Sequence, residues 1–178
     1  MLDDLDSLPQ LIVFDLDDTL WSGEVDSSGG PPFTPHKSSR HTIYCQRRRP
    51  MTLFQDVPSI FDDLVDHGVS IAYASRTWEP DWAKEALRNF ECGKEKVVNM
   101  WSAASGHSWG DIRKTSHMRD ISQQLAIPIS SMVFIDNDMR NIKDIRPLGA
   151  TCGYCPEGLD WAVMRNTLME HSDLMRKV

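Results

Sequence analysis

Two aspartates, Asp15 and Asp17, directly follow a run of apolar residues and are placed to share one chemical task. The run, residues 11–14 (LIVF), is typical of a strand buried on both faces in a parallel sheet. Side chains two positions apart on a strand leave the same face, so both carboxylates can address one ligand. Two negative charges this close repel unless a proton or a cation settles between them. Mg²⁺ fits, because it prefers oxygen ligands and takes only one or two protein carboxylates, which leaves room for a substrate phosphate.

A hydroxyl and a guanidinium follow a second apolar segment. Ser75 and Arg76 come directly after the strand predicted at residues 69–74. Both groups can hold phosphate oxygens. Since the carboxyl ends of parallel strands meet at one edge of a sheet, where open α/β folds form their active-site crevice, we expect this pair to lie near Asp15.

Two more charged features fit the same edge. Asp136 and Asn137 follow the apolar run at residues 132–135, so their oxygen atoms can also ligate a cation. Lys114 stands at a predicted helix start, where the helix dipole favours anions rather than cations. That misfit predicts that Lys114 serves an anionic site.

Helices and strands must alternate to bring these residues together. Helical spacing of apolar residues and suitably placed Asp, Gly and Pro predict helices between the apolar runs. This alternation is typical of an α/β fold with a doubly wound parallel sheet and helices on both faces. Residues 22–39 are rich in Gly, Pro, Ser and Thr, and a short patch at residues 42–45 follows. We expect an irregular flap with a hairpin over about residues 22–50. The predicted helices begin near residues 56, 80, 114, 139 and 159, and further short strands are predicted near residues 97–98 and 151.

The order of these motifs resembles that of the haloacid dehalogenase (HAD) superfamily. The four matching features are DLDDT at residues 15–19, the strand ending in Ser75, Lys114, and the cluster that begins at Asp136. More narrowly, the chain resembles the small magnesium-dependent phosphatases over nearly its whole length. The segments that carry this resemblance are FDLDDTLW, Pro31-Pro32-Phe33, Ala74-Ser75-Arg76-Thr77, Lys114 followed by His117, and Arg140-Asn141.

The resemblance implies a HAD-type Rossmann fold in one domain, residues 1–178, with the flap of about 22–50 in place of a large cap. It implies that Asp15 attacks phosphorus, while Asp17 first protonates the leaving oxygen and then activates water. Ser75 and Lys114 would hold the phosphoryl oxygens. Independently of the resemblance, the guanidinium of Arg76 can bind phosphate. Trp21, which follows the nucleophile motif directly, is expected to border the substrate. The residues that would hold Mg²⁺ are Asp15, Asp17, Asp136 and Asn137. A phosphorylated small molecule or a phosphoprotein is the expected partner, and the family allows phosphotyrosine, phosphorylated sugars and sugar adducts.

One position departs from the family pattern. Asn137 stands where the family usually has a second consecutive acidic residue. Its amide oxygen can still ligate Mg²⁺ but adds no charge, so metal affinity should fall. A non-catalytic phosphate-binding or metal-binding module is therefore an alternative to a phosphomonoesterase. A dehalogenase with the same nucleophile is a third reading, which Asp17 disfavours because an acid and base is what phosphate chemistry needs.

Each feature also has a plainer structural explanation. Asp15 and Asp17 could simply end a strand in a turn, and the ordered set of motifs is what favours chemistry. Trp78 and Trp82 have helical spacing and are predicted to be core residues. The run Arg47-Arg48-Arg49 is either a solvated loop or a dock for an acidic substrate.

Composition excludes several classes of protein. A net charge of −7 in 178 residues disfavours nucleic acid as a partner, since such proteins usually carry a basic face. The acidic amino terminus is unlike a signal peptide, and no apolar run approaches the roughly 20 residues that cross a bilayer. Four cysteines, Cys152 and Cys155 among them, are too few for a disulfide scaffold, so free thiols are expected. We expect a monomer in the cytoplasm, with no membrane partner.

Overall fold

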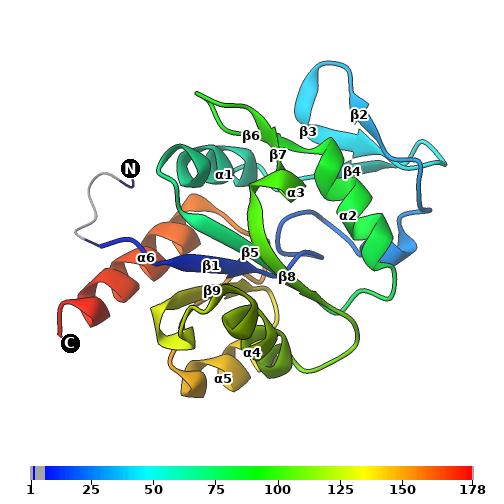
Figure 1. The fold of residues 1–178 in the computed structure, drawn as a ribbon. Helices are drawn as coiled ribbons and strands as arrows, with labels where there is room; N and C mark the ends of the chain where they lie inside the picture. Colours follow the sequence, from blue (N-terminus) through cyan, green and yellow to red (C-terminus); the bar gives the residue numbers. More distant parts are fainter. Residues whose placement is uncertain (1, 3–6, 178) are drawn as a thin grey trace.

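The computed structural model describes residue 2 and residues 7–177, and a five-stranded parallel sheet forms its centre (Figure 1). The sheet order is β10-β9-β1-β5-β8, which confirms the predicted α/β class. Every strand pair in this sheet is parallel, with β1 flanked by β5 on one side and β9 on the other. The strands are β1 (Leu11–Phe14), β5 (Ser70–Ser75), β8 (Ala104–Trp109), β9 (Met132–Asp136) and β10 (Thr151–Tyr154).

Helices cover both faces of this sheet, as expected of a doubly wound fold (Figure 1). On one face, Ile12 and Phe14 of β1 pack in a large cluster with apolar residues of α1, α2 and α6. On the other face, Leu11 and Val13 pack with Met118 of α4 and residues of α5 in a smaller cluster. The helices are α1 (Val57–Asp66), α2 (Pro80–Asn89), α4 (Lys114–Leu125), α5 (Met139–Ile145) and α6 (Trp161–Met175).

The chain reverses its direction of winding beside β1. From β1 it proceeds through α1 to β5 and through α2 to β8, then returns through α4 to β9 on the opposite side of β1. The two halves therefore separate between β1 and β9, and open α/β sheets bind ligands outside the carboxyl ends of the strands at such a point. Asp15 directly follows β1 and Asp136 ends β9, so the topology places the predicted catalytic residues at this crevice.

The flap is more regular than the sequence suggested. Three antiparallel strands, β2 (Thr34–His36), β3 (Ser39–Tyr44) and β4 (Pro50–Thr52), form a small separate sheet. A short 3-10 helix, η2 (Val25–Ser27), precedes them. The sheet is anchored because Phe33, Ile43 and Met51 are buried in the larger core cluster.

Strand β8 was not predicted. Its sequence, ASGHSW, has neither an apolar run nor a regular alternation, and it lies at the edge of the sheet. Gly106 has a packing reason, since a Cβ atom there would lie 3.0 Å from Leu125 Cδ1 of α4. The connection from α2 to β8 also holds β6 (Glu91–Cys92), β7 (Val98–Asn99) and the short α3 (Met100–Ala103), of which only β7 was expected.

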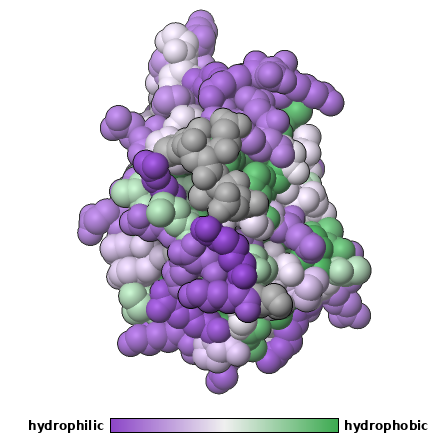
Figure 2. Space-filling view, turned by 90° about the vertical axis from the view of Figure 1, so that its left-hand side faces the viewer, coloured by the Kyte–Doolittle hydropathy of each residue, from purple (hydrophilic) through white to green (hydrophobic). Residues whose placement is uncertain are grey.

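Figure 2 shows the side of the molecule onto which the amino ends of the central strands open, and hydrophilic side chains predominate there. The acidic residues Asp3, Asp4 and Asp6, on which the expectation about signal peptides depends, lie outside the described residues. Within the described residues, no helix combines the length and apolar character needed to cross a membrane. The four cysteines are all buried and free, as predicted.

Candidate active site

Asp15 lies at the bottom of a cleft at the carboxyl edge of the sheet. Its carboxylate is nearly buried, with 8% of the residue exposed. Thr19 Oγ1 donates to Asp15 Oδ2 at 3.0 Å, and Lys114 Nζ donates to Oδ1 at 2.5 Å. Two donors therefore fix the orientation of this carboxylate, while the residue still lines the cleft. A carboxylate that is fixed yet accessible is suited to act as a nucleophile.

Asp17 lies in the same cleft but in a different environment. Its Oδ1 accepts hydrogen bonds from Trp21 Nε1 at 2.9 Å and from the Val25 backbone N–H at 2.8 Å. Burial raises the pKa of Asp17 to about 7, and the charge of Asp15 adds to the rise against the hydrogen bonds that oppose it. A carboxyl group with a pKa near neutrality can both give and take a proton, which is what general acid and base catalysis requires.

Lys114 is the first residue of α4 and is almost entirely buried. Besides Asp15, it lies 3.5 Å from Asp136 Oδ2 and donates a short hydrogen bond to the Ala74 carbonyl. These acceptors explain the misfit with the helix dipole, because two carboxylates and a carbonyl oxygen compensate the ammonium charge. Lys114 therefore lies beside two carboxylates, and its role toward a substrate stays a prediction.

Asp136 is fully buried and heavily hydrogen-bonded. Asn141 Nδ2 donates to both of its oxygens, at 3.0 and 2.9 Å, and the Asp138 N–H donates to Oδ1 at 2.7 Å. Burial and the nearby Asp15 raise its pKa, although Lys114 opposes this. The geometry makes Asp136 mainly the partner of Lys114 and Asn141.

Asn137 lines the cleft beside Asp15. Its backbone N–H donates to Thr19 Oγ1 at 3.1 Å, and its side-chain Oδ1 lies 3.5 Å from the same hydroxyl. Thr19 thus joins the loop after β1 to the loop after β9. The side chain that departs from the family pattern still brings an oxygen atom to the cleft.

The residues after β5 divide between buried and exposed positions. Ser75 is buried, and its Oγ accepts from the Thr77 N–H at 3.2 Å, which leaves the hydroxyl hydrogen able to donate. Arg76 lines the cleft with its side chain 45% exposed, 3.8 Å from Asp138 Oδ2. Arg76 is placed where it can reach an anionic ligand.

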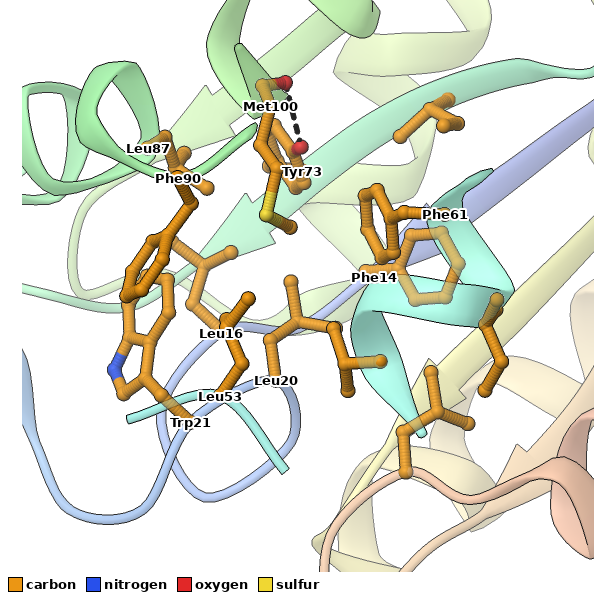
Figure 3. Close-up of a cluster of buried hydrophobic side chains, with 14 of the residues drawn as sticks. Phe14, Leu16, Leu20, Trp21, Leu53, Phe61, Tyr73, Leu87, Phe90 and Met100 are labelled. Atoms are coloured by element: carbon orange, nitrogen blue, oxygen red, sulfur yellow. Dashed lines mark hydrogen bonds between the residues drawn. The ribbon is translucent and has the colours of Figure 1, made fainter. Parts of the chain in front are cut away.

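Trp21 does not border the cleft, contrary to the sequence-based expectation. It is fully buried, stacks on Phe90 with ring centroids 6.1 Å apart, and is surrounded by apolar side chains (Figure 3). The indole occupies core volume because Leu20 and Leu53 pack beside it, and only its N–H reaches the site, through Asp17. Its contact with the site is therefore a hydrogen bond to the Asp17 side chain.

Trp78 shows the opposite difference from its sequence-based expectation, because it is exposed rather than buried. It was predicted to be a core residue, but 74% of it is exposed and it lines the cleft. It precedes α2, so the spacing from Trp82 is not a helical spacing. Arg47, Arg48 and Arg49 are exposed in the turn between β3 and β4 and are not among the residues that line the cleft.

The cleft has a volume of about 530 Å³ and is rich in oxygen atoms. We call the buried group Asp15, Thr19, Lys114 and Asp136 the floor, and the exposed apolar group Trp78, Met139 and Tyr154 the rim. In the described part of the chain, no three His, Cys, Asp or Glu side chains form a tight metal cluster. The carboxylates of Asp15 and Asp17 and the amide of Asn137 nevertheless face one cleft. This set suits Mg²⁺, which needs few protein ligands and keeps positions for water and phosphate.

Comparison with known proteins agrees with this chemistry. The acid phosphatase family matches residues 7–173. The chain is 37% identical to magnesium-dependent phosphatase 1 of Homo sapiens over 153 residues, which cover 86% of this chain and 81% of the human protein. It is 33% identical over 171 residues to a Saccharomyces cerevisiae protein described as a magnesium-dependent phosphatase, with 90% and 96% of the two chains covered.

Solved structures agree on the fold. The phosphatase domain of a Bacteroides fragilis protein in complex with Mg aligns with a TM-score of 0.60 and 22% identity, over 85% of this chain and 37% of that one. A HAD-superfamily hydrolase of Ehrlichia chaffeensis aligns with a TM-score of 0.60 and 12% identity, over 93% and 98% of the two chains. At these identities the likeness concerns the fold alone. The family match and the two similar phosphatases establish that the chain belongs to the acid phosphatase family of magnesium-dependent HAD-superfamily phosphatases.

Proposed function

We propose that this phosphatase hydrolyses phosphate monoesters through a phosphoaspartate on Asp15. An Asp15 carboxylate oxygen attacks phosphorus, the bond from phosphorus to the ester oxygen breaks, and Asp17 gives its proton to that oxygen. Asp17 then takes a proton from a water molecule as this water attacks the phosphoaspartate. The P–O bond to Asp15 breaks, inorganic phosphate leaves, and both carboxyl groups return to their initial states.

The other groups of the cleft would stabilise the transferring phosphoryl group. Lys114 and the Ser75 hydroxyl supply positive charge and a hydrogen bond at the place where Asp15 attacks. Mg²⁺, held by Asp15, Asp17 and Asn137 with Asp136 behind them, would neutralise charge on the phosphoryl oxygens when bound. Arg76, which lines the cleft, would meet the remaining charge from the open side.

The observation that carries this proposal is the contrast between the two neighbouring aspartates. Asp15 accepts hydrogen bonds from the buried Lys114 ammonium group and from Thr19, whereas burial raises the pKa of Asp17 to about 7. Neighbouring carboxyl groups in such different environments are the pattern expected of a nucleophile and a general acid. The alternative of a non-catalytic module rests on Asn137 alone, and Asn137 remains in the cleft with its oxygen available.

The substrate would be a phosphorylated small molecule or a phosphoprotein, with phosphotyrosine, sugar phosphates and phosphorylated sugar adducts as the classes to screen. We also propose a monomeric enzyme of the cytoplasm, in keeping with its four free cysteines.

The test is the release of p-nitrophenol from its phosphate ester, with Mg²⁺ and with a chelator. Asp15→Asn should abolish turnover, and Asp17→Asn should reduce it by a factor of about 10² to 10⁴. Acid quenching during turnover followed by mass spectrometry should find an acyl phosphate on Asp15 in the wild-type protein. Turnover that survives in Asp15→Asn would exclude this nucleophile, and inertness with every metal tried would favour the binding module.

A further inference from the structure

Large apolar side chains gather on the rim of the catalytic cleft. Among the described residues seven large apolar side chains are exposed, and three of them, Trp78, Met139 and Tyr154, line this one cleft. Trp78 is the most exposed of the seven, at 74%. Exposed apolar groups that gather around a concave site mark contact with a ligand. The floor receives the phosphoryl group, so the rim lies where the rest of the substrate must pass.

Trp78 is held over the cleft by a residue distant in sequence. Asp26, in the 3-10 helix η2, accepts a short hydrogen bond from Thr77 Oγ1 through one oxygen and a bond of 3.1 Å from the Trp78 N–H through the other. Thr77 Oγ1 also accepts from the Glu79 N–H at 3.0 Å. The loop that carries the exposed indole is therefore fixed by hydrogen bonds at Thr77, Trp78 and Glu79.

The same short helix also contacts the general acid. The N–H of Val25, the residue before Asp26, donates to Asp17. One segment thus fixes both the carboxyl group that protonates the leaving oxygen and the loop that presents Trp78. Such a connection is useful if Trp78 contacts the group attached to that oxygen.

The charges around the cleft restrict what this group can be. Asp18 and Glu24 are exposed and add negative charge to the lining beyond the carboxylates assigned to catalysis and metal binding. Among the described residues that line the cleft, Arg76 is the one cation, and Asp138 lies beside it. An anionic leaving group would be repelled, whereas an uncharged one with a flat apolar surface would gain contact with the indole.

We propose that Trp78 contacts the leaving group of the substrate, that Asp26 is the positioning residue that holds it there, and that the cleft favours esters of uncharged, ring-bearing alcohols. This inference rests on the proposed phosphatase reaction and adds a specificity determinant to it. It places substrate selection on the loop after β5 rather than on the arginines of the flap.

The test compares benzyl phosphate with n-propyl phosphate, both esters of uncharged primary alcohols, of which only one carries a ring. Trp78→Ala should lower kcat/KM for benzyl phosphate about tenfold, mainly through KM, and lower that for propyl phosphate much less, so that the preference of the enzyme falls. Trp78→Phe should restore most of the preference. Val97→Ala, which shortens an exposed apolar side chain away from the cleft, should leave both substrates unaffected.

Asp26 is tested by a matched pair of variants. Asp26→Ala removes both acceptors and should reduce the preference as Trp78→Ala does. Asp26→Asn can still accept from the Trp78 N–H and donate to the Thr77 hydroxyl, so it should retain most of the preference. An unchanged preference in Asp26→Ala would overturn the positioning role.

Two further outcomes separate this inference from the reaction on which it rests. If the wild type is active with Mg²⁺ but Trp78→Ala lowers both substrates equally or neither, the leaving-group contact is overturned and the phosphatase reaction stands. If the wild type hydrolyses neither these esters nor p-nitrophenyl phosphate, the proposed reaction fails, and the leaving-group contact fails with it.

Discussion

The floor and the rim of the cleft are built in opposite ways. Floor residues are buried and tied to one another, with Lys114 between Asp15 and Asp136 and Thr19 between two loops. Rim residues are exposed, and Trp78, with 74% of the residue exposed, is held by the hydrogen bond from its backbone N–H to Asp26. Changes in the floor should therefore affect both stability and the reaction with every substrate, whereas changes in the rim should affect only the choice of substrate.

The largest effect is expected from Lys114→Met. The change removes the ammonium group and leaves Asp15 and Asp136 as neighbouring buried carboxylates without their cation. Breaking such a buried pair usually costs about 3 to 5 kcal/mol of unfolding free energy. We expect kcat/KM to fall at least about 10³-fold, since charge stabilisation of the phosphoryl group is lost as well.

Chemical denaturation and p-nitrophenyl phosphate turnover would measure the two effects of Lys114→Met. Lys84→Met removes a partly exposed lysine that pairs with the exposed Asp81, and it provides the control because such pairs contribute little. Near wild-type stability and turnover in Lys114→Met would show that neither folding nor the reaction depends on the ion pairs between Lys114 and the floor carboxylates.

The next largest effect is on the pH dependence of stability, through a histidine buried close to Lys114. His117 is fully buried one turn after Lys114, and its Nδ1 lies 2.9 Å from Ser108 Oγ, which donates to Asp120. Burial, followed by the charge of Lys114, lowers the pKa of His117 to about 4. The unfolded chain, with an ordinary pKa near 6.5, therefore binds a proton that the folded protein does not.

The contribution of His117 to stability should thus be fully present above about pH 6.5 and should decline as the pH falls toward about 4, by an amount on the order of 2 kcal/mol. Urea denaturation of the wild type and of His117→Gln between pH 7 and pH 4 would measure it as the difference between the two proteins, because the raised pKa values of Asp17 and Asp136 act in the opposite direction in both. The exposed His41→Gln should follow the wild type. The same pH dependence in His117→Gln as in the wild type would assign any decline to other groups, such as the buried His171.

The sequence predicted the floor far better than the rim, for a physical reason. Apolar runs before Asp15 and Asp136 identify buried parallel strands, and the topology of such sheets brings their carboxyl ends together. The start of α4 at Lys114 was also correct. Each of these signals is local, so the pattern of neighbouring residues is sufficient to read it.

The missed features depend on contacts between distant segments. Strand β8 consists mostly of small and polar residues. It forms a strand because it pairs with β5 and packs against α4. The hydrogen bond from the Trp78 N–H to Asp26 joins residues 52 positions apart. The local sequence of neither segment predicts this contact. For the same reason, residue type alone could not tell that Trp21 is buried and Trp78 exposed.

A smaller effect is expected from Asn137→Asp. Asn137 lines the cleft but belongs to neither the floor nor the rim. The change adds a negative charge beside Asp15 and Asp17, so Mg²⁺ should bind more tightly. We expect the Mg²⁺ concentration for half-maximal activity to fall roughly tenfold, which corresponds to about 1.4 kcal/mol. Titration of activity with Mg²⁺ would measure it, and a large gain in maximal turnover as well would support the view that Asn137 weakens the wild-type site.

The smallest effect is expected from Met139→Ala on the rim. Met139 is the first residue of α5, and 38% of it is exposed, so less packed apolar area is lost when the side chain is shortened than at a fully buried methionine. Alanine also favours a helix, and the free energy of unfolding should change by no more than about 0.5 kcal/mol. Thermal denaturation would measure this beside Met118→Ala, a buried methionine of α4 whose truncation should cost about 2 to 5 kcal/mol. Comparable losses in the two variants would mean that the rim is part of the packed structure, and the distinction between a rigid floor and a replaceable rim would fail.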